Sequence, residues 1–385
     1  APAAAGGDDG GPSGRACGGL VPLFAVGGAL RAVLIGVAVL QDMWAEVPYT
    51  DVDYRVFSEA AENVALGLSP FEGRTELLRN PETRYRYSPL LAYLLLPNVL
   101  LHPAWGKVLF SALDLVAARR LATWLWAHNA STDSVWWGVA ASLLNPFTFT
   151  ISTRGSCESV VVVLLYGMLD ALEVRKQTKV AACLFGLAVH FRVYPIIYAL
   201  PLLFCVGAQS GRRGWRCLLS PDAVVFALVS AGVFLALLLL FTAAYGAEFL
   251  QATYLHHASR VDTQHNFSVY FYPMRWLPWL ARLASFPQLA ACLALGWTSG
   301  EAPLAPALLL QTLCFVALNR VVTAQYFVWW LALLPPALPW LALDARLATE
   351  LVLWAVAEVH WLAWAYLLEF RRWPVAALVW AASCA

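Results

Sequence analysis

Charged side chains are scarce in this sequence. Asp, Glu, Lys and Arg make up 13% of its 385 residues, whereas 61% of the residues are hydrophobic. A soluble domain carries about 25% charged residues, and no single core could bury so much apolar surface. The composition therefore excludes an ordinary soluble protein and predicts a protein whose solvent is lipid. Because the formal net charge is only +1, the total charge indicates no nucleic-acid partner.

Closely spaced cysteine pairs are also lacking. The eight cysteines form no CxxC motif, and most lie in apolar runs, where a thiol behaves as a small hydrophobic group. This spacing argues against a disulfide framework, and we predict no metal ligands. The sequence also shows no internal repeat at any period, which argues against the inverted-repeat plan of many transporters.

Long apolar runs, by contrast, recur along the chain, and a bilayer core of about 30 Å needs about 20 apolar residues per helix. They predict an all-α polytopic membrane protein with roughly ten transmembrane helices, at residues 20–40, 105–127, 134–153, 156–172, 221–243, 277–297, 303–320, 327–343, 350–370 and 374–385. Residues 88–102 are shorter and contain Pro89 and Pro97, so we expect an interfacial or re-entrant helix there. The Gly/Ala-rich residues 1–19 read as a disordered tail before a single transmembrane domain, 20–385.

The basic residues predict the orientation of the chain. Lys and Arg favour cytosolic loops, and the clearest basic loops are residues 173–179 and 207–220. With both loops cytosolic, residues 180–206 enter and leave on one face as two half-membrane helices. A single ordinary span with one loop on the wrong side is the alternative. The opposite, lumenal face then holds the loops 41–104 and 244–276, a turn at 154 and a link at 319–326.

Two carboxylates follow the first predicted span. Asp51 and Asp53 lie just past a membrane exit and before an amphipathic helical pattern. Side chains two positions apart cannot share a helix face, but in an extended segment they point to the same side. Such a pair could deprotonate a sugar hydroxyl, hold a divalent cation or bind an amine. A chance DxD in a loop is the simpler alternative.

Arginines and tyrosines alternate in the next segment, where Arg84 and Arg86 are interleaved with Tyr85 and Tyr87. Guanidinium groups match phosphate oxygens, and aromatic rings stack on sugars. A solvated basic face anchored by interfacial tyrosines is the alternative.

One carboxylate, Asp114, lies inside an apolar run. A charge at that depth is costly and takes a functional or a paired role. Arg119 and Arg120, on the same predicted helix, are the expected neutralising partners.

Further polar groups gather in the later loops. His257, Arg260, His265 and Asn266 lie together, but their spacing contains no HxxxH zinc pair, which favours phosphate and sugar binding over a metal. Arg154 and Glu158 mark one helix end, and Gln325 and Tyr326 mark another. A lipid-interface anchor is the alternative for both pairs.

Six segments carry a family resemblance. In order they are YTDVDYRVFSEAA, RYRYSPLLAYLLLPN, TRGSCES, GLAVHFRVYPIIYALP, YLHHASRVDTQHNFSVYFY and TAQYFVWWLALLP. Over about residues 20–370 the chain resembles the family of the first GPI mannosyltransferase, the catalytic α-1,4-mannosyltransferase of glycosylphosphatidylinositol anchor assembly. The resemblance implies the GT-C architecture, with many transmembrane helices and catalytic lumenal loops.

The resemblance also implies a reaction in the endoplasmic reticulum membrane. Mannose would pass from dolichol-phosphate-mannose to the 4-hydroxyl of glucosamine on glucosaminyl-(acyl)phosphatidylinositol. Because the donor is β-linked and the product α-linked, one in-line inversion suffices, with a base near the acceptor and cations near the departing phosphate. Another lumenal dolichol-phosphate-mannose-dependent mannosyltransferase is the alternative, and a lipid or solute transporter a further one.

The family's DxD motif falls on Asp51 and Asp53, which are predicted to be catalytic, with Asp51 favoured as the base. The predicted substrate-binding residues are Arg84, Arg86, Tyr87, Arg154, Glu158, His190, Arg192, Tyr194, His257, Arg260, His265, Asn266, Gln325 and Tyr326. No cofactor is certain, and a divalent cation at the two aspartates is left open. The implied partners are the two lipids and a small single-span stabilising subunit, without nucleic acid.

Overall fold

The computed structural model describes residues 19–81, 83–256, 266–277, 279–342 and 344–384. Within these ranges the chain forms helices joined by turns and no strand, which confirms the predicted all-α class. The helices of eight or more residues are α2 (Val21–Trp44), α3 (Val52–Ala65), α7 (Trp105–Ala127), α8 (Thr132–Leu143), α9 (Pro146–Thr153), α10 (Glu158–Leu169), α11 (Thr178–Phe191), α12 (Ala199–Gln209), α13 (Pro221–Leu250), α17 (Ser285–Thr298), α18 (Leu304–Ala317), α21 (Ala345–Glu369) and α22 (Ala376–Cys384). The shorter ones are α4 (Glu76–Arg79), α5 (Pro89–Leu94), α6 (Leu96–Leu100), α15 (Phe271–Trp276), α16 (Leu280–Leu283), α19 (Phe327–Leu331) and α20 (Leu334–Ala337), with 3₁₀ or π turns η1 (Asp170–Val174), η2 (Tyr194–Tyr198), η3 (Gly214–Leu219), η4 (Gln251–Leu255), η5 (Ser299–Glu301), η6 (Ala324–Tyr326) and η7 (Leu338–Trp340).

Some helices of the bundle are long enough to cross a membrane. Among the residues that the structure describes, three helices are long and apolar enough to cross a membrane: Gly19–Trp44, Pro221–Leu255 and Ala345–Glu369. They contain the predicted spans 20–40 and 221–243 and most of 350–370. The protein is thus a membrane protein, while the number of about ten crossings stays a prediction, because the other helices are shorter or more polar.

Two predicted spans are interrupted. Residues 134–153 form α8 and α9, and the break falls at Asn145, which caps α9 while Pro146 takes its first position. Within the predicted span 327–343, residues 327–340 form α19, α20 and η7, with Pro335 in the first turn of α20. Proline lacks an N–H and suits the first turn of a helix, so the chain starts a new helix at each site. The expectation of continuous spans at these two places is wrong, because apolar composition does not register such breaks.

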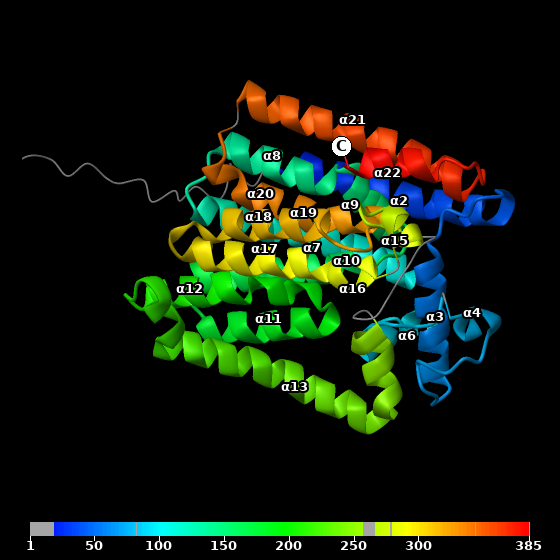
Figure 1. The fold of residues 1–385 in the computed structure, drawn as a ribbon, viewed down its shortest axis with the longest axis horizontal. Helices are drawn as coiled ribbons and strands as arrows, with labels where there is room; N and C mark the ends of the chain where they lie inside the picture. The colour runs from blue at the N-terminus through cyan, green and yellow to red at the C-terminus, as the bar shows by residue number, and fades with distance from the viewer. Residues whose placement is uncertain (1–18, 82, 257–265, 278, 343, 385) are drawn as a thin grey trace, which may run out of the picture.

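Residues 180–206 form a hairpin of two short helices, as expected, whereas its half-membrane depth stays a prediction. α11 ends at Phe191, the turn η2 follows, and α12 runs back towards the end from which α11 came (Figure 1). Glu173, just before the hairpin, and Gln209, at its end, line one cavity of about 330 Å³, so both ends of the hairpin lie together. We call this the basic-loop end, because it carries residues 173–179 and 207–220.

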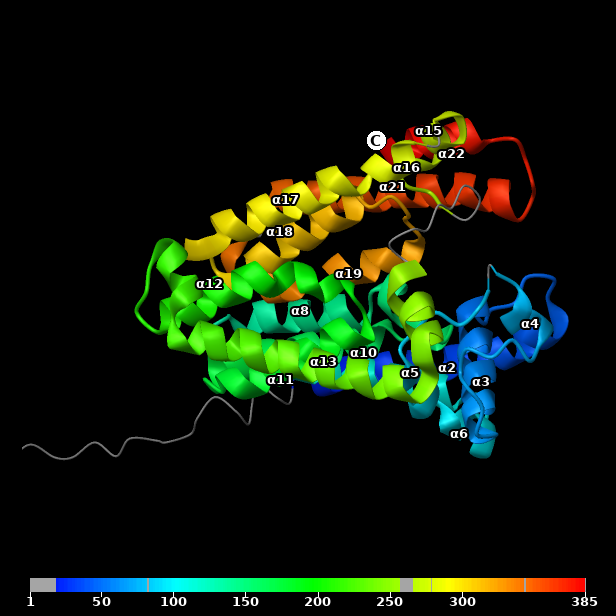
Figure 2. The same ribbon diagram turned by 60° about the horizontal axis from the view of Figure 1, so that its bottom comes forward.

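The opposite end of the bundle, which we call the site end, carries α3 to α6 as a separate block (Figures 1 and 2). α3 is the expected amphipathic helix, and it buries Tyr54 and Phe57 as it packs on α5 and α6. α13 bends at Gly246, whose φ of +66° is rarely adopted by other residues. Beyond the bend, the Phe249 ring lies 6.2 Å from that of Phe71 in the block.

The buried carboxylate of α7 is neutralised from another helix. Arg31 of α2 donates from Nε to Asp114 Oδ2 at 3.0 Å, and its Nη2 lies 2.9 Å from the same oxygen. The expected partners Arg119 and Arg120 do not pair with Asp114, because positions five and six residues on lie off its helix face. Arg120 instead lies 4.0 Å from Asp170.

Candidate active site

Asp51 ends the loop after α2 and caps α3. Its Oδ1 accepts the N–H of Asp53 at 3.1 Å, which satisfies a donor of the first helical turn. Its own N–H donates to the Arg154 carbonyl at 3.1 Å, and its Oδ2 lies 3.6 Å from the Arg154 guanidinium. The side chain remains 23% exposed. Asp51 is therefore a carboxylate held by the backbone but accessible from outside, as a general base must be.

Asp53 lies in the first turn of α3 and has a different partner. Its Oδ2 accepts the Tyr87 hydroxyl at 2.7 Å. Burial raises the pKa of Tyr87 well above its ordinary value, and the charge of Asp53 raises it further, so the hydroxyl stays protonated and donates. The extended segment expected for the two aspartates is not observed, because α3 begins at Val52, between them.

Arg192 links this pair to the interior. It follows α11 directly, in extended conformation, and its guanidinium lies 4.8 Å from the centre of the Tyr87 ring. The same guanidinium donates to Glu158 Oε1 at 2.5 Å, and Glu158 is 1% exposed. The other carboxylate oxygen accepts the indole N–H of Trp329 at 2.8 Å. Glu158 and Arg192 are thus joined in a buried ion pair.

Three aromatic rings continue the cluster. Trp329 stacks on Tyr194 with ring centres 3.9 Å apart and on Tyr326 with centres 4.3 Å apart. These rings come from η2, η6 and α19, so they fix the turn of the α11–α12 hairpin against the start of α19. The structure therefore brings together eight predicted site residues in one connected set: Asp51, Asp53, Tyr87, Arg154, Glu158, Arg192, Tyr194 and Tyr326.

His190 lies beside this set but is enclosed. It is 1% exposed, and its Nε2 lies 3.0 Å from Ser88 Oγ while its Nδ1 lies 2.9 Å from the Tyr254 hydroxyl. Both ring nitrogens therefore have protein partners. The histidine ties α11 to the segment after Tyr87 and to η4.

The remaining predicted residues lie apart from the cluster or outside the described residues. Arg84 is exposed and pairs with Glu248 of α13, and Arg86 donates to the Pro81 carbonyl. Asn266 is fully buried, and its side chain donates to the Arg320 carbonyl at 2.8 Å, which holds the link 319–326. Gln325 lies in η6, next to Tyr326. The predicted residues that the structure does not describe are His257, Arg260 and His265.

Several groups that hold the site were not singled out from the sequence. Trp329 is in an apolar run, and its spacing does not show that its N–H meets a carboxylate 171 positions earlier. Lys107 lies at the start of a predicted span, where a cation is ordinarily interpreted as an anchor at the membrane interface. No pattern in the sequence indicated a site role for Tyr254 or Ser88. The available hint was a lysine in the first turn of an apolar helix, directly after the predicted loop 41–104 that contains both aspartates.

Metal binding is not indicated by the residues the structure describes. Outside the ranges left undescribed, no three His, Cys, Asp or Glu side chains are grouped as metal ligands. The seven cysteines in the described part of the chain are free thiols. A divalent cation at Asp51 and Asp53 stays an open prediction.

Comparisons with known proteins give the family. The family profile described as "Mannosyltransferase (PIG-M)" matches residues 151–385. A Danio rerio protein named "GPI alpha-1,4-mannosyltransferase I, catalytic subunit" is 43% identical over 371 residues, which cover 94% of this chain and 92% of the relative. "GPI mannosyltransferase 1" of Dictyostelium discoideum is 35% identical (90% and 84% covered), and that of Schizosaccharomyces pombe is 34% identical (88% and 91%).

A solved structure shares the fold. The crystal structure of ArnT from Cupriavidus metallidurans, bound to undecaprenyl phosphate, superposes with a TM-score of 0.52 at 18% identity. The match covers 90% of this chain and 65% of that one. ArnT is a GT-C enzyme, so the bundle with its site-end block has the GT-C fold.

Fold and site together define a membrane-embedded glycosyltransferase of the GT-C type. The chain belongs to the PIG-M mannosyltransferase family.

Proposed function

We propose that this enzyme transfers the first mannose, in α-1,4 linkage, from dolichol-phosphate-mannose to glucosaminyl-(acyl)phosphatidylinositol in GPI-anchor biosynthesis. The names of relatives that this chain matches along 88% or more of its length support this reaction. Both substrates are lipids, which suits a site at the end of a membrane bundle. The small single-span stabilising subunit belongs to the proposal and is tested by co-purification from membranes.

The proposal places the enzyme in the endoplasmic reticulum membrane with the site end in the lumen. The basic loops support this orientation, because they lie together at the end of the bundle opposite α3, the helix that Asp51 caps. A tag at Gly211 should react in cells permeabilised only at the plasma membrane, whereas a tag at Gly73 should stay protected. Protection of the Gly211 tag would overturn the orientation.

One observation carries the catalytic assignment: Asp51 is fixed through its backbone and Oδ1, while its Oδ2 stands 3.6 Å from Arg154 at a partly exposed position. We assign that oxygen, which forms an ion pair with Arg154, as the acceptor of the proton from the acceptor hydroxyl. Asp53 accepts a hydrogen bond from Tyr87. We assign it to stabilising the first turn of α3 and to binding the acceptor amine, not to accepting the proton. Arg154, which lies beside Asp51, is assigned to the donor phosphate, whereas the enclosed His190 and Asn266 are assigned to holding the surrounding segments.

The deciding experiment replaces Asp51 by Asn, which keeps the shape and the helix cap but cannot accept a proton. A base that acts in the transition state contributes about 10²–10⁴ in rate, so Asp51→Asn should reduce mannosyl transfer by at least about 100-fold. The matched control is Asp133→Asn, an exposed carboxylate in the first turn of α8, and it should transfer mannose at the wild-type rate. Near-normal transfer by a folded Asp51→Asn variant would end the assignment.

A further inference from the structure

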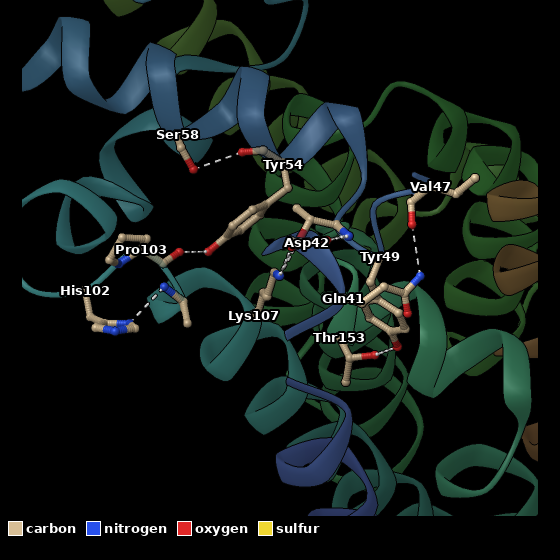
Figure 3. Close-up of polar contacts among 12 residues, drawn as sticks. Gln41, Asp42, Val47, Tyr49, Tyr54, Ser58, His102, Pro103, Lys107 and Thr153 are labelled. Carbon is tan, nitrogen blue, oxygen red and sulfur yellow. Dashed lines mark hydrogen bonds and ion pairs between the residues drawn. The ribbon is translucent and has the colours of Figure 1, made fainter. Parts of the chain in front are cut away.

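A buried lysine stands beside the loop that carries Asp51. Lys107 lies in the first turn of α7 and is only 5% exposed. Its ammonium lies 5.5 Å from the centre of the Tyr54 ring, and Figure 3 shows it directed at Asp42. A buried ammonium is costly unless it is paired and hydrogen-bonded. The partners of the Lys107 ammonium therefore indicate the structural role of its charge.

Those partners lead to Asp51. The Lys107 ammonium donates to Thr50 Oγ1 at 2.5 Å and lies 3.8 Å from Asp42 Oδ2. Thr50 in turn donates twice to Asp42, from its N–H at 2.9 Å and from its hydroxyl. Thr50 thus accepts from the lysine and donates to the carboxylate at the end of α2. It is also the residue immediately before Asp51.

The other side of the same loop is held as well. The Tyr49 hydroxyl lies 2.7 Å from Thr153 Oγ1 of α9 (Figure 3), and the Asp51 N–H donates to Arg154. Tyr54, four residues after Thr50, donates its hydroxyl to the Pro103 carbonyl at 2.6 Å, just before α7. The loop is therefore fixed to α2, α7 and α9 at once.

We propose that Lys107 is a positioning residue that sets the direction of the Asp51 carboxylate through Thr50. The inference rests on the proposed function, since it assumes that Asp51 is the base. Lys107 touches neither reacting group: it fixes the Thr50 side chain, and the backbone from Thr50 to Asp51 transmits that constraint. Catalysis is sensitive to such placement, and a shift of about 1 Å can cost about 100-fold in rate.

The test measures kcat, the KM for each lipid and the abundance of the full-length enzyme in its membrane. Lys107→Met removes the donor, and Thr50→Val removes the hydroxyl but keeps the branched shape. We expect each to lower kcat by about 10–100-fold, with both KM values within about twofold of wild type. Thr50→Ser keeps the hydroxyl and should retain wild-type kcat. Lys179→Met, an exposed lysine in the first turn of α11, is the control that should change nothing.

A double variant tests whether Lys107 and Thr50 affect kcat through one shared contact or independently. If Lys107 acts through Thr50, Lys107→Met with Thr50→Val should lose no more kcat than the worse single variant. The inference would be overturned if the kcat losses of the two single variants multiply in the double variant. A wild-type kcat for Lys107→Met, or equal kcat losses for Thr50→Ser and Thr50→Val, would also overturn it. A purely structural role would lower abundance and leave the kcat of the folded enzyme unchanged. If Lys107→Met does not accumulate in the membrane, the comparison of kcat between Thr50→Val and Thr50→Ser tests the inference.

The two proposals fail differently. An active Asp51→Asn variant overturns the proposed function itself. An inactive Asp51→Asn variant beside fully active Lys107→Met and Thr50→Val variants overturns only the positioning role.

Discussion

Replacing Arg192 with methionine leaves the Glu158 carboxylate buried without its cation. Methionine fills much of the space but provides no donor, and Glu158 is 1% exposed, so water cannot take over. Breaking a buried pair from one side costs about 3–5 kcal/mol in the free energy of unfolding. The double variant Arg192→Met with Glu158→Gln removes the stranded charge, and the Gln oxygen can still accept the Trp329 N–H. It should therefore recover about 1–3 kcal/mol of that loss.

The assay is equilibrium unfolding in mixed detergent and SDS micelles, followed by circular dichroism. Arg346→Met is the control, because Arg346 pairs with Glu350 at the surface and its side chain is 85% exposed. It should not change stability measurably. The reasoning is refuted if Arg192→Met loses no more stability than Arg346→Met, or if the double variant is less stable than Arg192→Met.

Three further predictions follow from the contacts around the site. Tyr87→Phe removes the donor to Asp53 and should slow mannosyl transfer by about 10–100-fold at normal abundance, as measured in the transfer assay; an unchanged rate would remove that hydrogen bond from the mechanism. Gly155→Ala should sharply reduce folded protein in membrane extracts, because φ is +97° and the added Cβ would lie 2.3 Å from the Tyr54 ring; normal yield would contradict this packing. Arg31→Leu strands the buried carboxylate of α7 and should lower unfolding stability by about 3–5 kcal/mol, with an unchanged midpoint as the contrary result.

The sequence predicted most of what depends on local pattern. The bounds of α7 coincide with the predicted span 105–127, and α11 and α12 form the expected hairpin. Asp51 and Arg154 were both placed at helix ends on one face, where the structure joins them. These features depend on apolar run length and charge placement, which are visible in a single stretch of chain.

What the sequence missed depends on contacts between distant segments. Asp114 pairs with Arg31, a residue 83 positions earlier on another helix. Helix spacing argues against Arg119 and Arg120 as partners, but no local pattern in the sequence identifies Arg31. The division of 134–153 depends on how Asn145 caps the next helix, a competition that apolar composition does not register.

The Glu158–Arg192 pair also constrains how the protein is made. Glu158 and Arg192 are synthesised early, whereas Trp329, which satisfies the second carboxylate oxygen, is added 171 residues after Glu158. Until η6 and α19 leave the ribosome, the turn of the α11–α12 hairpin lacks the rings that cover it. Chains that stop before Trp329 therefore expose a polar turn and an incompletely bonded carboxylate in the nascent bundle. The Glu158 carboxylate therefore obtains both of its partners only after Trp329 has been added.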